Sequence, residues 1–322
     1  MGNHLDKPMT TKDSHDATLN GLSYAASAMQ GWRVNMEDTH CAHVITIGGQ
    51  SATLVCVFDG HGGDLVAIEA AKRIKPTLET ALTDCNILDP QSIGETMQEA
   101  MLSLDDELKH MAAVQNGTDK SGCTAIVAIL TDTHIIVANA GDARGILVQG
   151  DSSVRPMSFD HKPMNPEETA RIEAAGGYVS SRRVNGDLAV SRALGDFTYK
   201  QADSVPAKDQ SVTAFPDIEI TERDGTDQFL LLACDGIWDV MTNDEAGAFV
   251  KEHVEGGYKG EPMSKVLERL LNKCLEKSSM DNMTAAMVVF SGITPGENEK
   301  PPEAIFKEME ANGMDMNKTQ RL

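Results

Sequence analysis

Two apolar segments, far apart in the sequence, end in the same way, with an aspartate followed by a glycine. Residues 54–58 are apolar and precede Asp59, and residues 229–234 are apolar and precede Asp235. Short apolar runs that stop at a glycine are typical of buried β-strands. Two such strands can bring two carboxylates to one edge of a hydrophobic core, where like charges repel unless a proton or a cation neutralises them. The pattern therefore predicts a divalent-metal site.

Other acidic residues border apolar segments in a similar manner, although each of them alone is compatible with a structural role. Oxygen ligands without clustered cysteine or histidine favour magnesium or manganese over zinc or copper. The six cysteines occur singly, never as Cys-x-x-Cys, and are predicted to be reduced core residues. The candidate carboxylates are Glu37, Asp59, Asp235 and Asp281, with Asp142 and Asp239 flanking strands more loosely.

Length and charge exclude several classes of protein. The chain has 322 residues, enough for one large domain or two smaller ones. Its net charge of −21 disfavours binding to nucleic acid, which requires a basic face. Its apolar runs are shorter than the roughly 18 residues of a membrane-spanning helix, and residues 1–16 lack the apolar centre of a secretory signal. We therefore expect no transmembrane segment, no nucleic-acid partner and a location in the cytoplasm or the nucleus.

The order of the predicted elements indicates the fold class. Segments with strand character come in runs, and helical segments come in pairs between these runs. Between residues 90 and 111, for example, apolar residues recur every three or four positions, as in an amphipathic helix. A parallel sheet would instead require strands and helices in strict alternation. We expect an α+β fold with two antiparallel sheets and helices packed outside them, and a long irregular excursion over residues 179–209.

Composition divides the chain into three parts. Residues 1–20 are polar and are predicted to form an N-terminal arm, residues 21–292 form the folded domain, and residues 293–322 form a mobile polar tail. Gly2 stands where N-myristoylation requires a glycine, although Asp6 replaces the Ser or Thr of the consensus. A single acyl chain would give only weak, reversible membrane attachment.

Eight short motifs recur in a characteristic order between residues 21 and 290. They lie at residues 33–38, 59–63, 121–125, 140–144, 160–163, 188–196, 235–239 and 281–284. Together they resemble the motifs of the metal-dependent type 2C serine/threonine protein phosphatases, and the consecutive run 188–196 is particularly specific. Residues 1–8 also resemble the myristoylated start of animal members of that family. We therefore expect peripheral membrane association if Gly2 is acylated.

The resemblance implies a four-layer sandwich, in which two central antiparallel β-sheets are flanked by pairs of α-helices, with a two-metal site at one end. By motif position, Asp59 would be the ligand shared by both ions. Asp235 and Asp281 would hold one ion, and Glu37 and the carbonyl of Gly60 would hold the other. The resemblance thus supplies an arrangement for the carboxylates that the strand ends predict.

The same resemblance implies roles for the remaining polar residues of the motifs. Asp142 and Asp239 match a weaker third-metal position. Arg33 would bind the phosphate group of the substrate, and its planar fork can hold two phosphate oxygens. His61 would protonate the leaving alkoxide, which matters because a serine alkoxide is a poor leaving group. Asp38 would orient a metal-bound water.

The implied activity is hydrolysis of phosphoserine and phosphothreonine monoesters in proteins, by in-line attack of a hydroxide that bridges two Mg²⁺ or Mn²⁺ ions. Two ions roughly 3.5–4 Å apart lower the pKa of the bridging water and neutralise charge at phosphorus. We expect a monomer whose partners are phosphorylated proteins. In the family, the segment that is here residues 177–187 lies beside the active site and influences recognition, and its Arg182 and Arg183 are either substrate contacts or solvated surface charge.

Two alternative functions stay open. One is a pseudophosphatase, which keeps the fold and binds partners without turnover, and the intact set of acidic residues speaks against it. The other is a divalent-metal hydrolase that acts on nucleotides or small phosphate esters. Comparison of phosphopeptides with nucleotides as substrates separates this alternative from a protein phosphatase.

Overall fold

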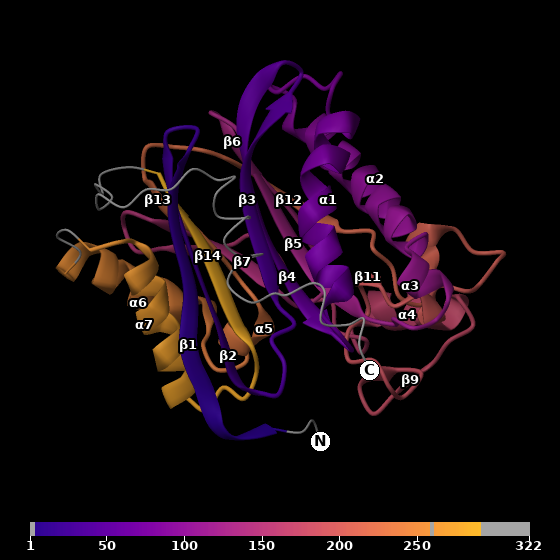
Figure 1. The fold of residues 1–322 in the computed structure, drawn as a ribbon. Coiled ribbons are helices and arrows are strands. Elements are labelled where there is room, and N and C mark those ends of the chain that lie inside the picture. The colour runs from indigo at the N-terminus through magenta and orange to yellow at the C-terminus, as the bar shows by residue number, and fades with distance from the viewer. Residues whose placement is uncertain (1–3, 258–260, 291–322) are drawn as a thin grey trace.

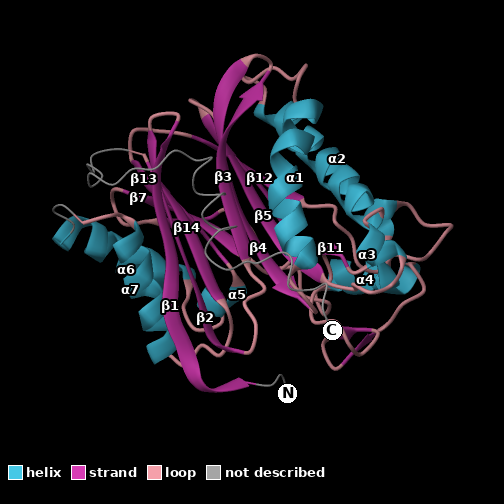
Figure 2. Cartoon of the chain, viewed as in Figure 1, coloured by secondary structure: helices cyan, strands magenta, loops and turns pink. Residues whose placement is uncertain are grey.

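A computed structural model describes residues 4–257 and 261–290, so Gly2 and the predicted tail at 293–322 lie outside the described residues. Two antiparallel sheets face each other, and helices cover the outer face of each sheet (Figures 1 and 2). The predicted α+β sandwich of four layers is therefore confirmed. Within the described ranges, no helix is both long and apolar enough to span a membrane.

The first sheet contains six strands that pair antiparallel with their neighbours. Its central strands, β13 and β14, are mainly apolar, as expected for strands buried on both faces. In spatial order the strands are β1 (His4–Leu19), β2 (Leu22–Arg33), β14 (Met283–Val289), β13 (Asp227–Ala233), β7 (Arg144–Gln149) and β8 (Val154–Pro156).

The second sheet is also antiparallel, and a short extra strand, β11 (Leu194–Gly195), pairs with one end of its central strand β5. That extra strand returns the chain to the sheet after the irregular segment. In spatial order the main strands are β12 (Asp217–Glu222), β6 (His134–Ala140), β5 (Gly122–Leu130), β4 (Gln50–His61) and β3 (Thr39–Ile47).

Strand alternation places the predicted metal ligands between the two sheets. In β5, Ile126 belongs to the core between the sheets, whereas the next residue, Val127, packs into the core beneath the helices. In β4, Val57 belongs to the core between the sheets, so Asp59, two residues later, lies on the same face of its strand. The Asp59 carboxylate is therefore at the end of the layer that joins the two sheets.

Helices α1 (Leu65–Ala81) and α2 (Pro90–Lys109) cover the second sheet, and α6 (Asn243–Gly257) and α7 (Ser264–Glu276) cover the first (Figure 1). Helix α2 begins where the Asp89 side chain accepts a hydrogen bond from the backbone N of Ser92 and where Pro90 occupies the first turn. It buries the predicted apolar stripe. The shorter helices are α3 (Ala112–Gln115), α4 (Pro166–Ala174), α5 (Asp235–Trp238), η1 (Phe197–Tyr199) and η2 (Ala207–Asp209).

The segment 179–209 is largely irregular, as predicted. It contains the two-residue strands β9 (Val179–Ser180) and β10 (Arg183–Val184), then β11, and then short 3-10 turns. A small apolar cluster joins three residues of this segment, Val184, Val190 and Ala193, to Ile172 and Val212 outside it. This cluster gives the segment a defined conformation beside the end of the sandwich.

The N-terminal segment differs from the prediction of a polar arm, because residues 4–19 form strand β1. His15, Ala17 and Leu19 are buried at every second position, while their neighbours are more exposed. The Asp16 carboxylate also accepts a hydrogen bond of 2.9 Å from the backbone N of Ser264, at the start of α7. The prediction was wrong because β1 is an edge strand with a polar outer face. Only its last residues, from His15 to Leu19, enter the core.

Candidate active site

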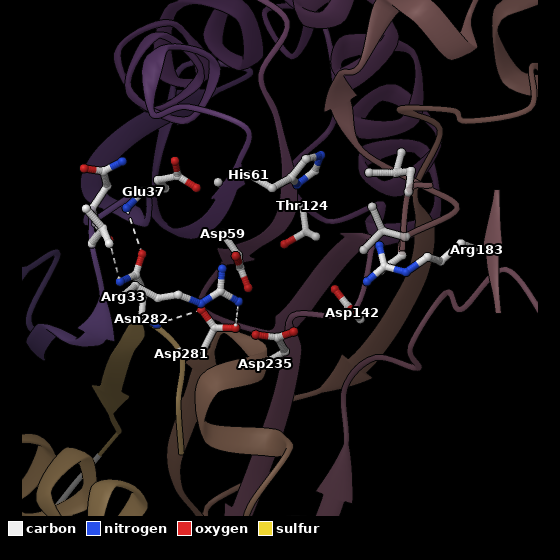
Figure 3. A pocket seen from close by; sticks show the side chains of 16 residues that line it. Arg33, Glu37, Asp59, His61, Thr124, Asp142, Arg183, Asp235, Asp281 and Asn282 are labelled. Atoms are coloured by element: carbon white, nitrogen blue, oxygen red, sulfur yellow. Dashed lines mark hydrogen bonds and ion pairs between the residues drawn. The ribbon is translucent and has the colours of Figure 1, made fainter. Parts of the chain in front are cut away.

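A pocket of about 550 Å³ opens at the end of the sandwich, where β4 and β13 deliver Asp59 and Asp235 (Figure 3). Of the predicted site residues, Asp38 and Asp239 are not part of the pocket wall. The structure brings the other eight together around the pocket: Arg33, Glu37, Asp59, Gly60, His61, Asp142, Asp235 and Asp281.

The glycine after each of the two aspartates allows a second loop to approach. A Cβ atom at Gly60 would lie 2.2 Å from the carbonyl oxygen of Glu37, and one at Gly236 would lie 1.9 Å from the carbonyl oxygen of Asn282. Any larger residue would push these loops away from the strand ends. Strand β4 continues past Asp59 and Gly60 to His61, so its end is later than the sequence predicts, whereas β13 stops at Ala233, just before Asp235. In both places the glycine admits the loop that carries Glu37 or Asp281.

The carboxylates at the centre of the pocket repel one another. Desolvation raises the pKa of Asp59 well above its usual range, and the charge of Asp235 raises it further. Desolvation also raises the pKa of Asp235, with further contributions from Asp142 and Asp281. Burial raises the pKa of Glu37 as well. A divalent cation between these oxygens would remove the repulsion, so the residues present fit the predicted Mg²⁺ or Mn²⁺.

Asp38 lies behind the pocket and is only 3% exposed. Burial raises its pKa to about 7, against the opposing effect of hydrogen bonds from Thr284 and Cys234. The Thr284 hydroxyl donates to Asp38 Oδ2 at 2.7 Å. Ligand atoms of Asp38, Asp59 and Cys234 all lie within 4.8 Å of one another, so Asp38 adjoins the cluster from behind. The contribution of Cys234 was not predicted from the sequence.

The predicted third-metal residues lie beside a lysine. Asp142, in the tight turn after β6, forms an ion pair with Lys162. Asp239 follows helix α5, and its backbone N donates to the carbonyl of Asp235 at 2.8 Å. Burial raises the pKa of Asp239, while the charge of Lys162 lowers it. Sequence reasoning missed Lys162, although it belongs to the motif at 160–163.

Both candidate catalytic side chains have acidic partners. Arg33 forms an ion pair with Asp281, and its side chain remains 43% exposed to the pocket. His61 Nε2 lies 2.6 Å from Asp196 Oδ2. Burial lowers the pKa of His61, but the charge and the hydrogen bond of Asp196 outweigh burial and leave the pKa raised. The imidazolium form, which can donate a proton, therefore persists to higher pH than in a free histidine.

Asn282 positions the loop that carries Arg33 and Glu37, a role that sequence reasoning did not identify. Its Nδ2 donates to the carbonyl oxygens of Gln30 and Asn35 at 2.8 and 2.9 Å, and its Oδ1 accepts from the backbone N of Glu37 at 2.9 Å. One amide thus connects the end of β2 to the start of β14. Its place directly after Asp281 was the available sequence signal.

The remaining pocket wall includes side chains of less obvious chemistry. Thr124 lines the pocket, and its buried hydroxyl has no hydrogen-bond partner among the described residues. From the predicted recognition segment, Arg183 reaches the wall (Figure 3). Residues 188–190 add an apolar edge to the pocket. The segment predicted to influence recognition therefore does lie beside the pocket.

The chain is similar to known protein phosphatases. The protein phosphatase 2C family model matches residues 22–283. Protein phosphatase 1B of Mus musculus is 39% identical over 300 residues, which cover 90% of this chain and 76% of the relative. Protein phosphatase 1A of Homo sapiens is 38% identical over 315 residues, which cover 96% of this chain and 80% of the relative.

A solved structure also shares the fold. The crystal structure of a phosphatase from Toxoplasma gondii superposes with a TM-score of 0.75 at 24% identity, and the match covers 89% of this chain and 98% of that one. This likeness concerns the fold alone. The family model and the close relatives show that the chain belongs to the protein phosphatase 2C family, whose members are metal-dependent. It is accordingly a protein phosphatase.

Proposed function

We propose that this phosphatase hydrolyses phosphoserine and phosphothreonine monoesters in proteins with two Mg²⁺ or Mn²⁺ ions in the pocket. The observation that carries the proposal is the pair of carboxylates at the pocket, Asp59 and Asp235, whose pKa values are raised by desolvation and by the charges of neighbouring carboxylates. Glu37, Asp281 and the carbonyl of Gly60 would complete the ligand set. Asp142 and Asp239 would hold a weaker third ion.

The bound ions would lower the pKa of a water molecule and offset negative charge at phosphorus. The residues of the chain supply the remaining functions. Arg33, which is partly exposed at the pocket wall, binds two phosphate oxygens through its guanidinium. Asp38, held by the Thr284 hydroxyl, orients the attacking water. His61 donates a proton to the leaving oxygen of serine or threonine.

The form of the pocket favours a segment of a phosphorylated protein over a small phosphate ester. The wall beyond the carboxylates includes Arg183 and the apolar residues 188–190, which can contact residues on either side of a phosphorylated side chain. We propose that the enzyme acts as a monomer on phosphoproteins in the cytoplasm or the nucleus. Acylation of Gly2, which lies outside the described residues, would add peripheral membrane association.

The test is phosphate release from a phosphothreonine peptide, compared with release from nucleotides, in Mn²⁺ or Mg²⁺ and then in excess chelator. We expect turnover of the peptide that chelation abolishes. Asp59→Asn should lose this turnover, whereas Asp151→Asn, the same change at an exposed turn, should keep it. Turnover that survives chelation, or full activity in Asp59→Asn, would contradict the two-metal site. Metal binding by calorimetry without any turnover would instead favour a pseudophosphatase.

A further inference from the structure

His61 is the last residue of β4, Asp196 directly follows β11, and the two side chains meet across a glycine. In the second sheet, Gly122 of β5 pairs with His61 of β4 on one side and with Gly195 of β11 on the other. A Cβ atom at Gly122 would lie 2.2 Å from Asp196 Oδ2 and 2.7 Å from His61 Nε2. The bare backbone of Gly122 is therefore what leaves room for the contact between the imidazole and the carboxylate.

The Asp196 carboxylate is buried, with its side chain only 5% exposed, whereas the His61 side chain is 29% exposed and lines the pocket. A buried carboxylate requires a hydrogen-bonding or charged partner. The 2.6 Å contact with His61 Nε2 provides one. Asp196 also adopts a left-handed backbone conformation, with φ of +52°, which is uncommon outside glycine. Such a conformation persists only where the surroundings enforce it.

Contacts with helix α2 hold Asp196 in this conformation. The Asp105 carboxylate accepts a hydrogen bond of 2.8 Å from the backbone N of Gly195 and a second of 2.7 Å from Lys200 Nζ. Lys200 Nζ also donates to the carbonyl of Ala193 at 2.8 Å. These bonds attach both ends of the turn to the helix. The position of Asp196 is therefore set by contacts outside the pocket.

We propose that Asp196 is a positioning residue of the phosphatase reaction and acts through His61. Its carboxylate accepts a hydrogen bond from Nε2–H. This hydrogen bond fixes the orientation and the tautomer of the ring, and it leaves Nδ1 to face the leaving oxygen of the substrate. As the phosphorus–oxygen bond breaks, the proton passes from Nδ1 to the leaving oxygen, and the ring returns to neutral with Nε2–H still held by Asp196. This proposal rests on the acid role of His61 proposed above.

A double-mutant cycle with two substrates tests it. Phenyl phosphate has a poor leaving group and needs the acid, whereas p-nitrophenyl phosphate has a good one. We expect Asp196→Asn to lower kcat for phenyl phosphate by about 10–100-fold, with a much smaller loss for p-nitrophenyl phosphate. In the His61→Ala background, Asp196→Asn should cause no further loss. Independent losses that multiply would overturn the proposal.

The cycle distinguishes failure of this inference from failure of the proposed function. Equal losses on both substrates in His61→Ala would contradict the proposed role of His61 as the acid. A loss confined to phenyl phosphate in His61→Ala, with no such loss in Asp196→Asn, would overturn only the role of Asp196. The matched control is Asp209→Asn, an exposed aspartate in the same irregular segment. Calorimetry of Mn²⁺ binding and thermal unfolding report whether each variant keeps its metal site and its fold.

A second measurement reports the tautomer of His61 directly in the unmodified chain. Long-range ¹H–¹⁵N correlation spectra distinguish the two tautomers of neutral histidine, and the His61 signals are identified by their loss in His61→Ala. We expect neutral His61 in the metal-free protein to carry its proton on Nε2. A proton on Nδ1 would overturn the proposal. A change of tautomer in Asp196→Asn, with none in Asp209→Asn, would support it.

Discussion

Asp59, a proposed metal ligand, shows at the scale of one residue how a carboxylate in the pocket affects the stability of the protein. The residue is placed by the regular alternation of β4, and burial together with the charge of Asp235 raises its pKa. The folded chain therefore holds the proton of this carboxyl more tightly than the unfolded chain does. Without a cation, the fold disfavours ionisation of Asp59. At neutral pH this carboxyl therefore lowers the free energy of unfolding of the metal-free protein.

The first prediction concerns the pH dependence of stability in the metal-free protein. Because the pKa of Asp59 is raised in the folded state above its ordinary value of 3.8, the folded state binds more protons, and stability falls as pH rises above about 4. Asp59→Asn removes this effect. In chelator at pH 7 we expect the variant to be more stable than the wild type by about 1–3 kcal/mol, measured by urea unfolding.

The difference should shrink as the pH approaches the unfolded pKa, since both proteins are then neutral at this position. Added Mn²⁺ should reverse the order, because it binds the folded wild type and stabilises it by mass action. Asp151→Asn at the exposed turn serves as the matched control. A metal-free wild type that is more stable than Asp59→Asn at neutral pH would show that the buried charge is compensated within the chain.

The residues that the sequence singles out as a pair, and that the structure brings to one pocket, have an informative local context. Asp59 and Asp235 each follow an apolar strand and precede a glycine, and the pocket contains both. Lys162 and Asn282 act through contacts with residues distant in the sequence, namely the ion pair with Asp142 and the hydrogen bonds to the loop before Glu37. Such contacts depend on strand register and loop approach, which no local pattern specifies.

At the scale of elements, β1 shows where periodicity stops being informative. Its outer half is mostly polar and has no buried residue, so the strand pattern is present only where His15, Ala17 and Leu19 alternate with less buried residues. The amphipathic helix α2 was predictable because its stripe repeats over many turns. An edge strand with one contact face and few apolar residues gives a much weaker signal.

The second prediction follows from the position of β1. Deletion of residues 2–19 removes the buried side chains of Ala17 and Leu19 and exposes the edge of β2. We expect a loss of stability on the order of 3–5 kcal/mol, measured by urea unfolding. The matched control is deletion of residues 2–9 alone, which removes mostly exposed side chains and should cost much less. Equal stability of the longer deletion and the full chain would mean that β1 is dispensable.

At the scale of the whole molecule, the site joins the two sheets. Asp59 and His61 come from the second sheet, whereas Arg33 and Asp235 lie at the ends of strands of the first. These proposed site residues are therefore separated by most of the chain and meet only when both sheets have packed. The sequence could predict the sandwich from the order of its elements, but the meeting of the strand ends depends on the packing of the two sheets.

The whole molecule also sets the electrostatic field that a substrate meets. The chain carries a net charge of −21, and a phosphopeptide brings at least one negative phosphate to it. Long-range repulsion slows the encounter of like-charged partners and is screened by salt, with a Debye length of about 10 Å at 0.1 M. Basic residues around the phosphorylated side chain would offset this repulsion.

We therefore predict that kcat/KM depends on the charge of the flanking residues and on ionic strength. At about 20 mM salt, a phosphothreonine peptide with lysine flanks should exceed one with glutamate flanks by roughly tenfold, and about 300 mM salt should narrow the ratio to a few-fold. A peptide with neutral flanks provides the control, and kcat should change little because the effect acts on encounter. A ratio that does not respond to salt would instead locate the selection in short-range contacts, such as those available to Arg183 in the pocket wall.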